Sequence, residues 1–192
     1  MLGVLRKNIT LLKVTSPSLF LRHFNFTVNM SSIAKDEKQI SSSNVNSVLI
    51  GSDHGGYEMK EQLKNYLKSC EIDFEDVGTY STDSCDYPDI AHTLCNKLVS
   101  NNNGDDKTRR GILVCGTGIG ISIAANKVPG IRCALCHDHY TVSMSRKHND
   151  ANVLALGGRT TGIEIAKEMV DVFLTEKHDG GRHSRRVNKI EK

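Results

Sequence analysis

The sequence alternates five short apolar runs with five amphipathic segments, and this alternation constrains the fold more than any other feature. The runs are largely continuous in apolar residues, which is typical of strands that helices cover on both faces. They span residues 48–52, 72–77, 111–115, 131–136 and 152–156. Helical spacing of apolar residues follows each run, over 59–70, 87–99, 118–127, 138–147 and 163–173. We therefore predict a single α/β domain of three-layer, Rossmann-like architecture with a five-stranded parallel sheet.

The charge of the chain is concentrated at its beginning. Residues 1–46 carry a formal charge of +4, whereas the other 146 residues carry −1. A nearly neutral body with 5% aromatic residues gives little support for nucleic-acid binding. No apolar run reaches the roughly 18 residues that a membrane helix needs. We expect neither nucleic acid nor a membrane as a partner.

The first 46 residues form an extension outside the predicted domain, which covers 47–192. Residues 1–35 are rich in Ser, Thr and basic side chains, with no acid before Asp36, as in an organelle transit peptide. A disordered tail fits as well, and so does an upstream start with the working protein beginning near Met30. We expect a cytoplasmic protein, with organelle targeting by residues 1–35 as the alternative.

Six cysteines raise the question of disulfides or a metal site. A body of this size buries enough surface without disulfides, and four of the six cysteines lie in apolar runs. The stretch "CALCH" at 133–137 matches a haem-attachment pattern and a zinc-ligand pair. However, residues three apart in a strand point to opposite faces, and no second ligand pair completes a zinc site. We expect free thiols, no metal and no cofactor.

Chemically versatile residues gather where the predicted strands end. In a parallel sheet these ends meet at one edge, where such folds bind ligands. The segments at this edge are Ser52–Gly56, Cys115–Gly120, Cys136–His139 and Gly157–Arg159. We predict the functional site there.

The glycine-rich stretch "LVCGTGIGISIAANK" at 113–127 permits more than one ligand. It lacks the Gly-Lys-Ser/Thr of a nucleoside-triphosphate loop. It also departs from the dinucleotide pattern G-x-G-x-x-G, although Asp138 lies 22 residues after Gly116, so NAD binding stays an alternative. The remaining interpretation is a row of backbone amides that favours a phosphate or a developing oxyanion.

Cys115 ends a strand immediately before a helix, where the positive helix terminus favours a thiolate. A small residue filling a tight turn is the alternative. His54 follows Asp53 in a turn, and His148 lies at the end of a polar helix, so each can equally be a surface histidine. The basic side chains Arg159, Arg182, Arg185 and Arg186 are either a solvated face or a phosphate clamp.

Taken together, the motifs resemble the ribose-5-phosphate isomerase B family, which also includes galactose-6-phosphate isomerases. The resemblance covers residues 47 to about 190, with the motifs in family order. It rests on "GSDHGGYEMK", "DVGTYSTDSCDYPDIA", "ILVCGTGIGISIAANKVPGIRCAL", "SRKHNDANVLALGGRT" and "GGRHSRRV".

The resemblance implies an aldose–ketose isomerase that moves a proton between C1 and C2 of a sugar phosphate through a cis-enediol, without metal or nucleotide. It implies D-ribose 5-phosphate and D-ribulose 5-phosphate as substrates, in the non-oxidative pentose phosphate pathway. Cys115 matches the catalytic base, and Thr117 and the loop amides would hold the enediolate oxygens. These amides belong to Gly116, Gly118, Ile119 and Gly120.

Other positions match groups that bind the substrate. Asp53 and His54 match sugar-binding residues, His148 matches the acid that opens the furanose ring, and Asn149 matches a neighbouring contact. The phosphate-binding arginines correspond to Arg159, Arg182 and Arg186.

The resemblance also implies an oligomer. Family members are homodimers or larger, such as homotetramers, and residues of the neighbouring subunit complete each site. In the galactose-6-phosphate branch two different subunits share the catalytic groups, whereas here one chain carries them all. This favours ribose 5-phosphate and a homo-oligomer.

Overall fold

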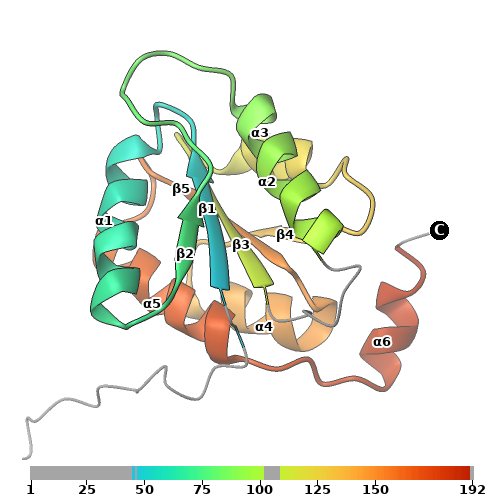
Figure 1. The fold of residues 1–192 in the computed structure, drawn as a ribbon. Coiled ribbons are helices and arrows are strands. Elements are labelled where there is room, and N and C mark those ends of the chain that lie inside the picture. Colours follow the sequence, from blue (N-terminus) through green and yellow to red (C-terminus); the bar gives the residue numbers. More distant parts are fainter. Residues whose placement is uncertain (1–44, 46, 102–108, 191–192) are drawn as a thin grey trace, which may run out of the picture. The chain divides into compact units, whose positions relative to one another are not determined.

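Five parallel strands form one sheet with β3 at its centre (Figure 1). The strand order is β2-β1-β3-β5-β4, and each neighbouring pair is parallel. The strands are β1 (Ser47–Ser52), β2 (Phe74–Asp76), β3 (Arg109–Cys115), β4 (Cys133–Leu135) and β5 (Val153–Gly157). The predicted five-stranded parallel sheet is confirmed.

The computed structural model describes residue 45 and residues 47–101 and 109–190, all of which belong to the unit Lys38–Lys192. Nearly all of the expected extension lies outside the described residues. The polar stretch 101–108, for which the sequence favours a surface loop, also lies outside them except for Asn101, which ends a helix. One residue assigned to the extension, Val45, is half-buried and packs against the hydrophobic core.

Helices cover both faces of the sheet, which confirms the three-layer arrangement (Figure 1). The helices are α1 (Tyr57–Ser69), α2 (Tyr87–Asn101), α3 (Ile119–Ala125), α4 (His139–Asn149), α5 (Ile163–Thr175) and α6 (Arg182–Val187). Helices α1, α4 and α5 pack on one face, and α2 and α3 pack on the other. None of these helices is long and apolar enough to cross a membrane.

Alternate residues of the central strands supply the two cores. On β1, Val48 and Ile50 face α1 and α5, where Phe173 is fully buried. Leu49 faces the opposite way and packs with Leu94 of α2. Because both faces are covered, an apolar residue is favoured at every strand position, and this accounts for the continuous apolar runs.

The two outer strands are shorter than the sequence predicts. The expected strands 72–77 and 131–136 are reduced to three residues each in β2 and β4. Each outer strand pairs with one neighbour and is only half-buried, so the flanking apolar residues pack against the core without pairing. Ile72 and Ile131 are examples of such residues.

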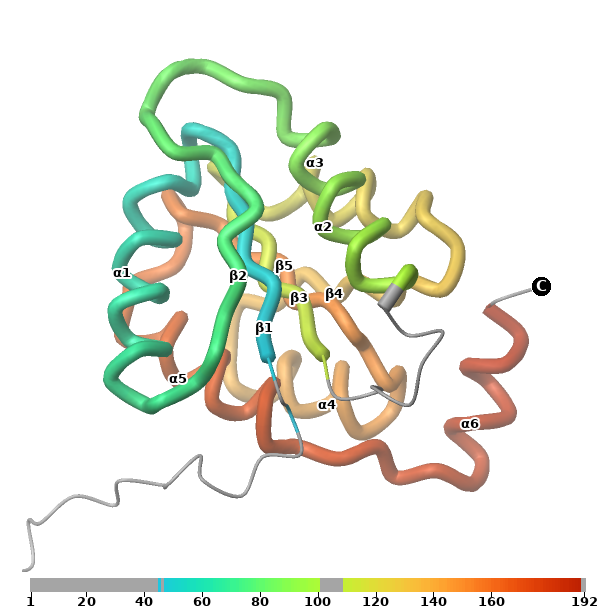
Figure 2. Tube along the Cα trace, viewed as in Figure 1, coloured from blue at the N-terminus to red at the C-terminus, as the bar shows by residue number. Residues whose placement is uncertain are grey.

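The basic tail contains a helix that the sequence pattern does not predict. Helix α6 follows α5 and packs against α4 (Figure 2). Only His183 and Val187, one turn apart, are buried, so no apolar stripe marks this helix.

Candidate active site

Three loops meet at the edge where β1, β3 and β5 end, as predicted. The amide of Asp53 donates to the carbonyl of Val114 (3.1 Å), which joins the β1 loop to β3. The amide of Gly158 donates to the carbonyl of Cys115 (2.8 Å), and that of Arg159 donates to the carbonyl of Gly116 (3.0 Å). These backbone hydrogen bonds hold the candidate residues of the three loops next to one another.

Cys115 occupies the centre of this edge. The residue is only 4% exposed, and the amide N–H of Gly118 points at Sγ from 3.1 Å. Gly118 has φ +77°. A Cβ at this position would lie 2.5 Å from Cδ1 of Leu135 and 3.0 Å from the backbone of Leu156. Glycine is therefore required for the turn that brings this amide to the sulfur. An N–H donor at this distance stabilises a thiolate more than a thiol.

The rest of the glycine loop is more open. Thr117 is exposed, and its hydroxyl accepts a hydrogen bond from the amide of Ile119 (3.4 Å). Gly116 lies beneath the exposed Arg159, whose Cδ and Nη1 would be 3.7 Å from a Cβ at that position. The guanidinium thus lies against the loop that carries Cys115.

Asp53 and His54 lie beside this loop on the turn after β1. Asp53 is 6% exposed, and its Oδ1 accepts a hydrogen bond from the amide of Gly56 (3.0 Å). Nδ1 of His54 accepts from the amide of Cys85 (3.3 Å). A neutral His54 therefore carries its proton on Nε2, which leaves that nitrogen as a donor for a ligand.

The remaining candidate residues lie at the opposite end of the sheet, where its strands begin. Helix α4 starts where β4 ends and runs for about 16 Å, so its last residues, His148 and Asn149, lie where β5 begins. Arg182 and Arg186 are in α6, which packs against α4. In Figure 1, α6 lies at the lower right, on the side where the strands begin, whereas α3 lies in the upper part of the picture, on the side where they end. One chain therefore does not bring the two groups of candidates together.

Hydrogen bonds with nearby side chains fix both ends of α4. Asp138 accepts a hydrogen bond from the amide of Thr141 (2.8 Å), and the Thr141 hydroxyl accepts one from the amide of Asp138 (3.4 Å). This reciprocal capping box fixes where the helix begins. At the other end Arg132 donates to the carbonyls of Asn149 and Asp150 (3.1 and 3.0 Å), which holds the last turn in place.

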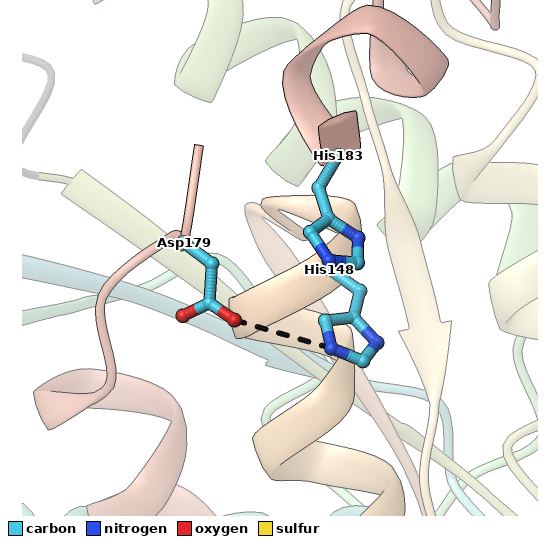
Figure 3. Close-up of side chains that lie close together, drawn as sticks. All are labelled: His148, Asp179 and His183. Carbon is cyan, nitrogen blue, oxygen red and sulfur yellow. Dashed lines mark ion pairs between the residues drawn. The ribbon is translucent and has the colours of Figure 1, made fainter. Parts of the chain in front are cut away.

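Two histidines and an aspartate cluster beside the end of α4 (Figure 3). The rings of His148 and His183 are stacked, with centroids 4.1 Å apart and planes within 4°. His148 Nε2 lies 4.0 Å from Asp179 Oδ2, and Arg182 Nε donates to His183 Nε2 (3.3 Å). Burial holds the pKa of His183 below its usual value, and the neighbouring His148 and the arginines of α6 add to this effect.

This cluster offers metal-ligand atoms but not the geometry of a metal site. The donor atoms of His148, Asp179 and His183 lie within 4.8 Å of one another, whereas those of a tetrahedral zinc site lie roughly 3.4 Å apart. Parallel rings direct their lone pairs alongside one another rather than to a common point. The "CALCH" pair fits a metal no better, because Cys133 packs on one face of the sheet and Cys136 on the other.

Three residues that contact the candidate site residues were not predicted from the sequence: Cys85, Asp179 and His183. His183 and Asp179 are brought to His148 by the packing of α6, which no local pattern predicts. The position of His183 inside "GGRHSRRV" was the available signal. Cys85 acts through its backbone amide, for which the sequence carries no signal.

Sequence comparisons identify the family of the chain. Residues 48–190 match the family model described as Ribose/Galactose Isomerase. Ribose-5-phosphate isomerase B of Escherichia coli is 41% identical over 143 residues, which are 74% of this chain and 93% of that protein.

Solved structures show the same fold. Ribose-5-phosphate isomerase B of Clostridium thermocellum superposes with a TM-score of 0.70 at 48% identity, covering 76% of this chain and 95% of that one. A ribose 5-phosphate isomerase of Thermotoga maritima gives 0.71 at 48% identity, covering 76% and 97%.

Proposed function

The chain belongs to the ribose/galactose isomerase family, and from that premise we propose that it interconverts D-ribose 5-phosphate and D-ribulose 5-phosphate. The observation that carries the proposal is the contact between Cys115 and the Gly118 amide, at the edge that also holds Asp53, His54 and Arg159. This edge combines a candidate base, oxyanion donors and a cation for phosphate.

In the proposed chemistry the Cys115 thiolate removes the proton from C2 of the open-chain aldose. The electron pair moves into a C1–C2 double bond and forms an enediolate, whose oxygens the Thr117 hydroxyl and the amides of 116–120 stabilise. The proton returns to C1 as the hydroxyl proton passes from O2 to O1, which gives the ketose. Atoms and charge balance without an external oxidant or reductant.

His148 acts before this step. As an imidazolium it gives a proton to the ring oxygen of the furanose as the C1–O bond breaks, and the anomeric hydroxyl loses its proton to solvent as the C1 carbonyl forms, which releases the open-chain aldose. Arg159, Arg182 and Arg186 bind the phosphate, since guanidinium groups pair with it in a bidentate manner. Asp53, His54 and Asn149 bind the sugar hydroxyls.

We also propose that the working unit is a homodimer or a homotetramer. The His148 group and the Cys115 group lie at opposite edges of one sheet, so a second copy must place its His148, Asn149, Arg182 and Arg186 over Cys115. Apolar side chains beside the Cys115 loop support such a contact. Ile119 and Ile123, one turn apart on α3, are 53% and 57% exposed.

The test is a direct assay of ketose formation from ribose 5-phosphate, with allose 6-phosphate and galactose 6-phosphate as comparison substrates. We expect ribose 5-phosphate to have the highest kcat/KM. Higher kcat/KM with a six-carbon substrate would change the assigned substrate, and no turnover with any of the three would refute the isomerase assignment.

A further inference from the structure

The stacking of His148 on His183 suggests how the proposed ring-opening acid, His148, is kept protonated. We propose that His183 is a positioning residue that keeps the single proton of the pair on His148 and links that ring to Arg182. The proposal rests on the proposed function, because it takes His148 as the ring-opening acid and Arg182 as a phosphate ligand.

The hydrogen bond from Arg182 fixes the state of His183. A guanidinium has only donors, so His183 Nε2, which accepts from Arg182 Nε at 3.3 Å, must present its lone pair. His183 is therefore neutral, with its proton on Nδ1. Its burial (8% exposed) disfavours a second proton, and so do the positive charges of Arg182 and Arg186.

The surroundings of His148 differ from those of His183. Its side chain is 38% exposed, and Nε2 faces the carboxylate of Asp179 at 4.0 Å. The face of a neutral imidazole at 4.1 Å accommodates a cation, whereas two charged rings at that distance repel. The pair thus holds one proton, and it resides on the ring that solvent and substrate can reach.

The two helices that carry the rings are joined beside the pair. Nδ1 of His178 bonds to the carbonyl of Lys147 (2.9 Å), and its Nε2 bonds to the hydroxyl of Ser184 (3.1 Å). The amide of Asp179 donates to the same Lys147 carbonyl (3.0 Å). These bonds hold α6 and Asp179 against the end of α4, so the stack is part of a fixed frame. The Lys147 ammonium forms an ion pair with the carboxylate of Glu176 (3.1 Å).

Two substitutions separate the two functions of His183. His183→Gln keeps an oxygen that accepts from Arg182 but removes the stacked ring, so we expect kcat to fall about tenfold with KM little changed. His183→Phe keeps a ring but removes the acceptor, so we expect KM to rise about tenfold with kcat little changed. His92→Gln, at an exposed position of α2, is the control.

A nitrogen-15 NMR titration of the histidine rings in the resting full-length protein tests the proton assignment without turnover. We expect His183 to keep an unprotonated Nε2 and a neutral ring while His148 takes up its proton. His183→Gln and His148→Gln assign the resonances. Protonation of His183 before His148, a proton on His183 Nε2, or equal effects of the two His183 variants on kcat and KM would overturn the proposal. An inactive wild type would refute the proposed function instead, and the ring resonances would still decide the state of His183.

Discussion

The backbone amide of Cys85 donates to Nδ1 of His54 at 3.3 Å, so the loop between β2 and α2 sets the tautomer of a sugar-binding candidate. The start of that loop is anchored by Lys60, whose side chain is fully buried. Its ammonium bonds to both carboxylate oxygens of Asp76 (2.8 and 2.7 Å) and to the carbonyl of Thr79 (2.7 Å). A buried ion pair in α1 and β2 thus supports a residue at the candidate site.

The first prediction concerns this ion pair. Lys60→Met should lower the free energy of unfolding by about 3 kcal/mol at pH 7, because it leaves Asp76 with Lys64 as its remaining cationic contact. Urea denaturation measures the change. Lys127→Met, at an exposed position, is the control and should have little effect. Equal stability of the two variants would contradict the role assigned to Lys60.

The difference in unfolding free energy between wild type and Lys60→Met should depend on pH, and the sign of this dependence follows from the pKa of Asp76. Although burial acts in the opposite direction, hydrogen bonds from Lys60 and Lys64 hold the pKa of Asp76 below its usual value. The stabilisation is therefore present above the unfolded pKa of about 4 and is lost as the pH falls through the lower folded value. The difference between wild type and Lys60→Met should narrow as the pH falls below about 4.

The second prediction concerns Cys115→Ser. Serine is nearly the same size, so folding should be unchanged, but its hydroxyl is too weakly acidic to act as an oxyanion base near neutral pH. We expect kcat to fall by at least ~10²–10⁴-fold in the ketose assay, with an unchanged denaturation midpoint. Near-normal kcat would make Cys115 a packing residue, and the base would then be sought among Asp53, His54 and His148.

Alkylation of the wild type provides a parallel measurement. Iodoacetamide should inactivate the protein, and ribose 5-phosphate should protect it. Burial raises the pKa of Cys95 to about 12 and that of Cys136 to about 11, so these thiols should react slowly. Cys70 and Cys85 are partly exposed, so peptide mapping must identify Cys115 as the protected residue.

The third prediction tests whether two copies share a site. Cys115→Ser and His148→Asn should each be inactive alone. After the two are unfolded and refolded together, mixed dimers carry one intact site, and random pairing should restore about a quarter of wild-type activity. A mixture as inactive as its components would contradict the shared site, provided that light scattering shows that the variants associate.

The fourth prediction concerns metal dependence. The proposed proton transfer uses a thiolate and backbone amides, so turnover should persist in excess EDTA. The measurement is the rate of ketose formation before and after dialysis against the chelator. Loss of activity that a divalent ion restores would contradict the mechanism.

The fifth prediction concerns the boundary of the domain. Because Val45 packs against the core, a chain that starts at residue 44 should match the full-length protein in kcat and unfolding free energy. A chain that starts at residue 46 should keep its activity but lose some stability. An insoluble or inactive product from the start at 44 would show that the domain needs the preceding residues.

The sequence predicted the central sheet well because β1, β3 and β5 are buried on both faces and are apolar throughout. It also predicted the Cys115 group, since loops after parallel strands meet at one edge. It did not predict where His148 lies relative to Cys115, because that depends on the direction of α4 across the sheet. The stack of His148 on His183 joins positions 35 residues apart, and no periodic pattern encodes such a contact.

The capping box at the start of α4 and the position of His148, the proposed acid, in its last turn have a consequence for how this protein can vary. Insertion of one residue within α4 would move His148 by about 1.5 Å along the axis and rotate it by roughly 100°. A substitution on the outer face of the helix leaves that position unchanged. Among homologues the number of residues between Asp138 and His148 should therefore vary far less than the identity of the residues between them.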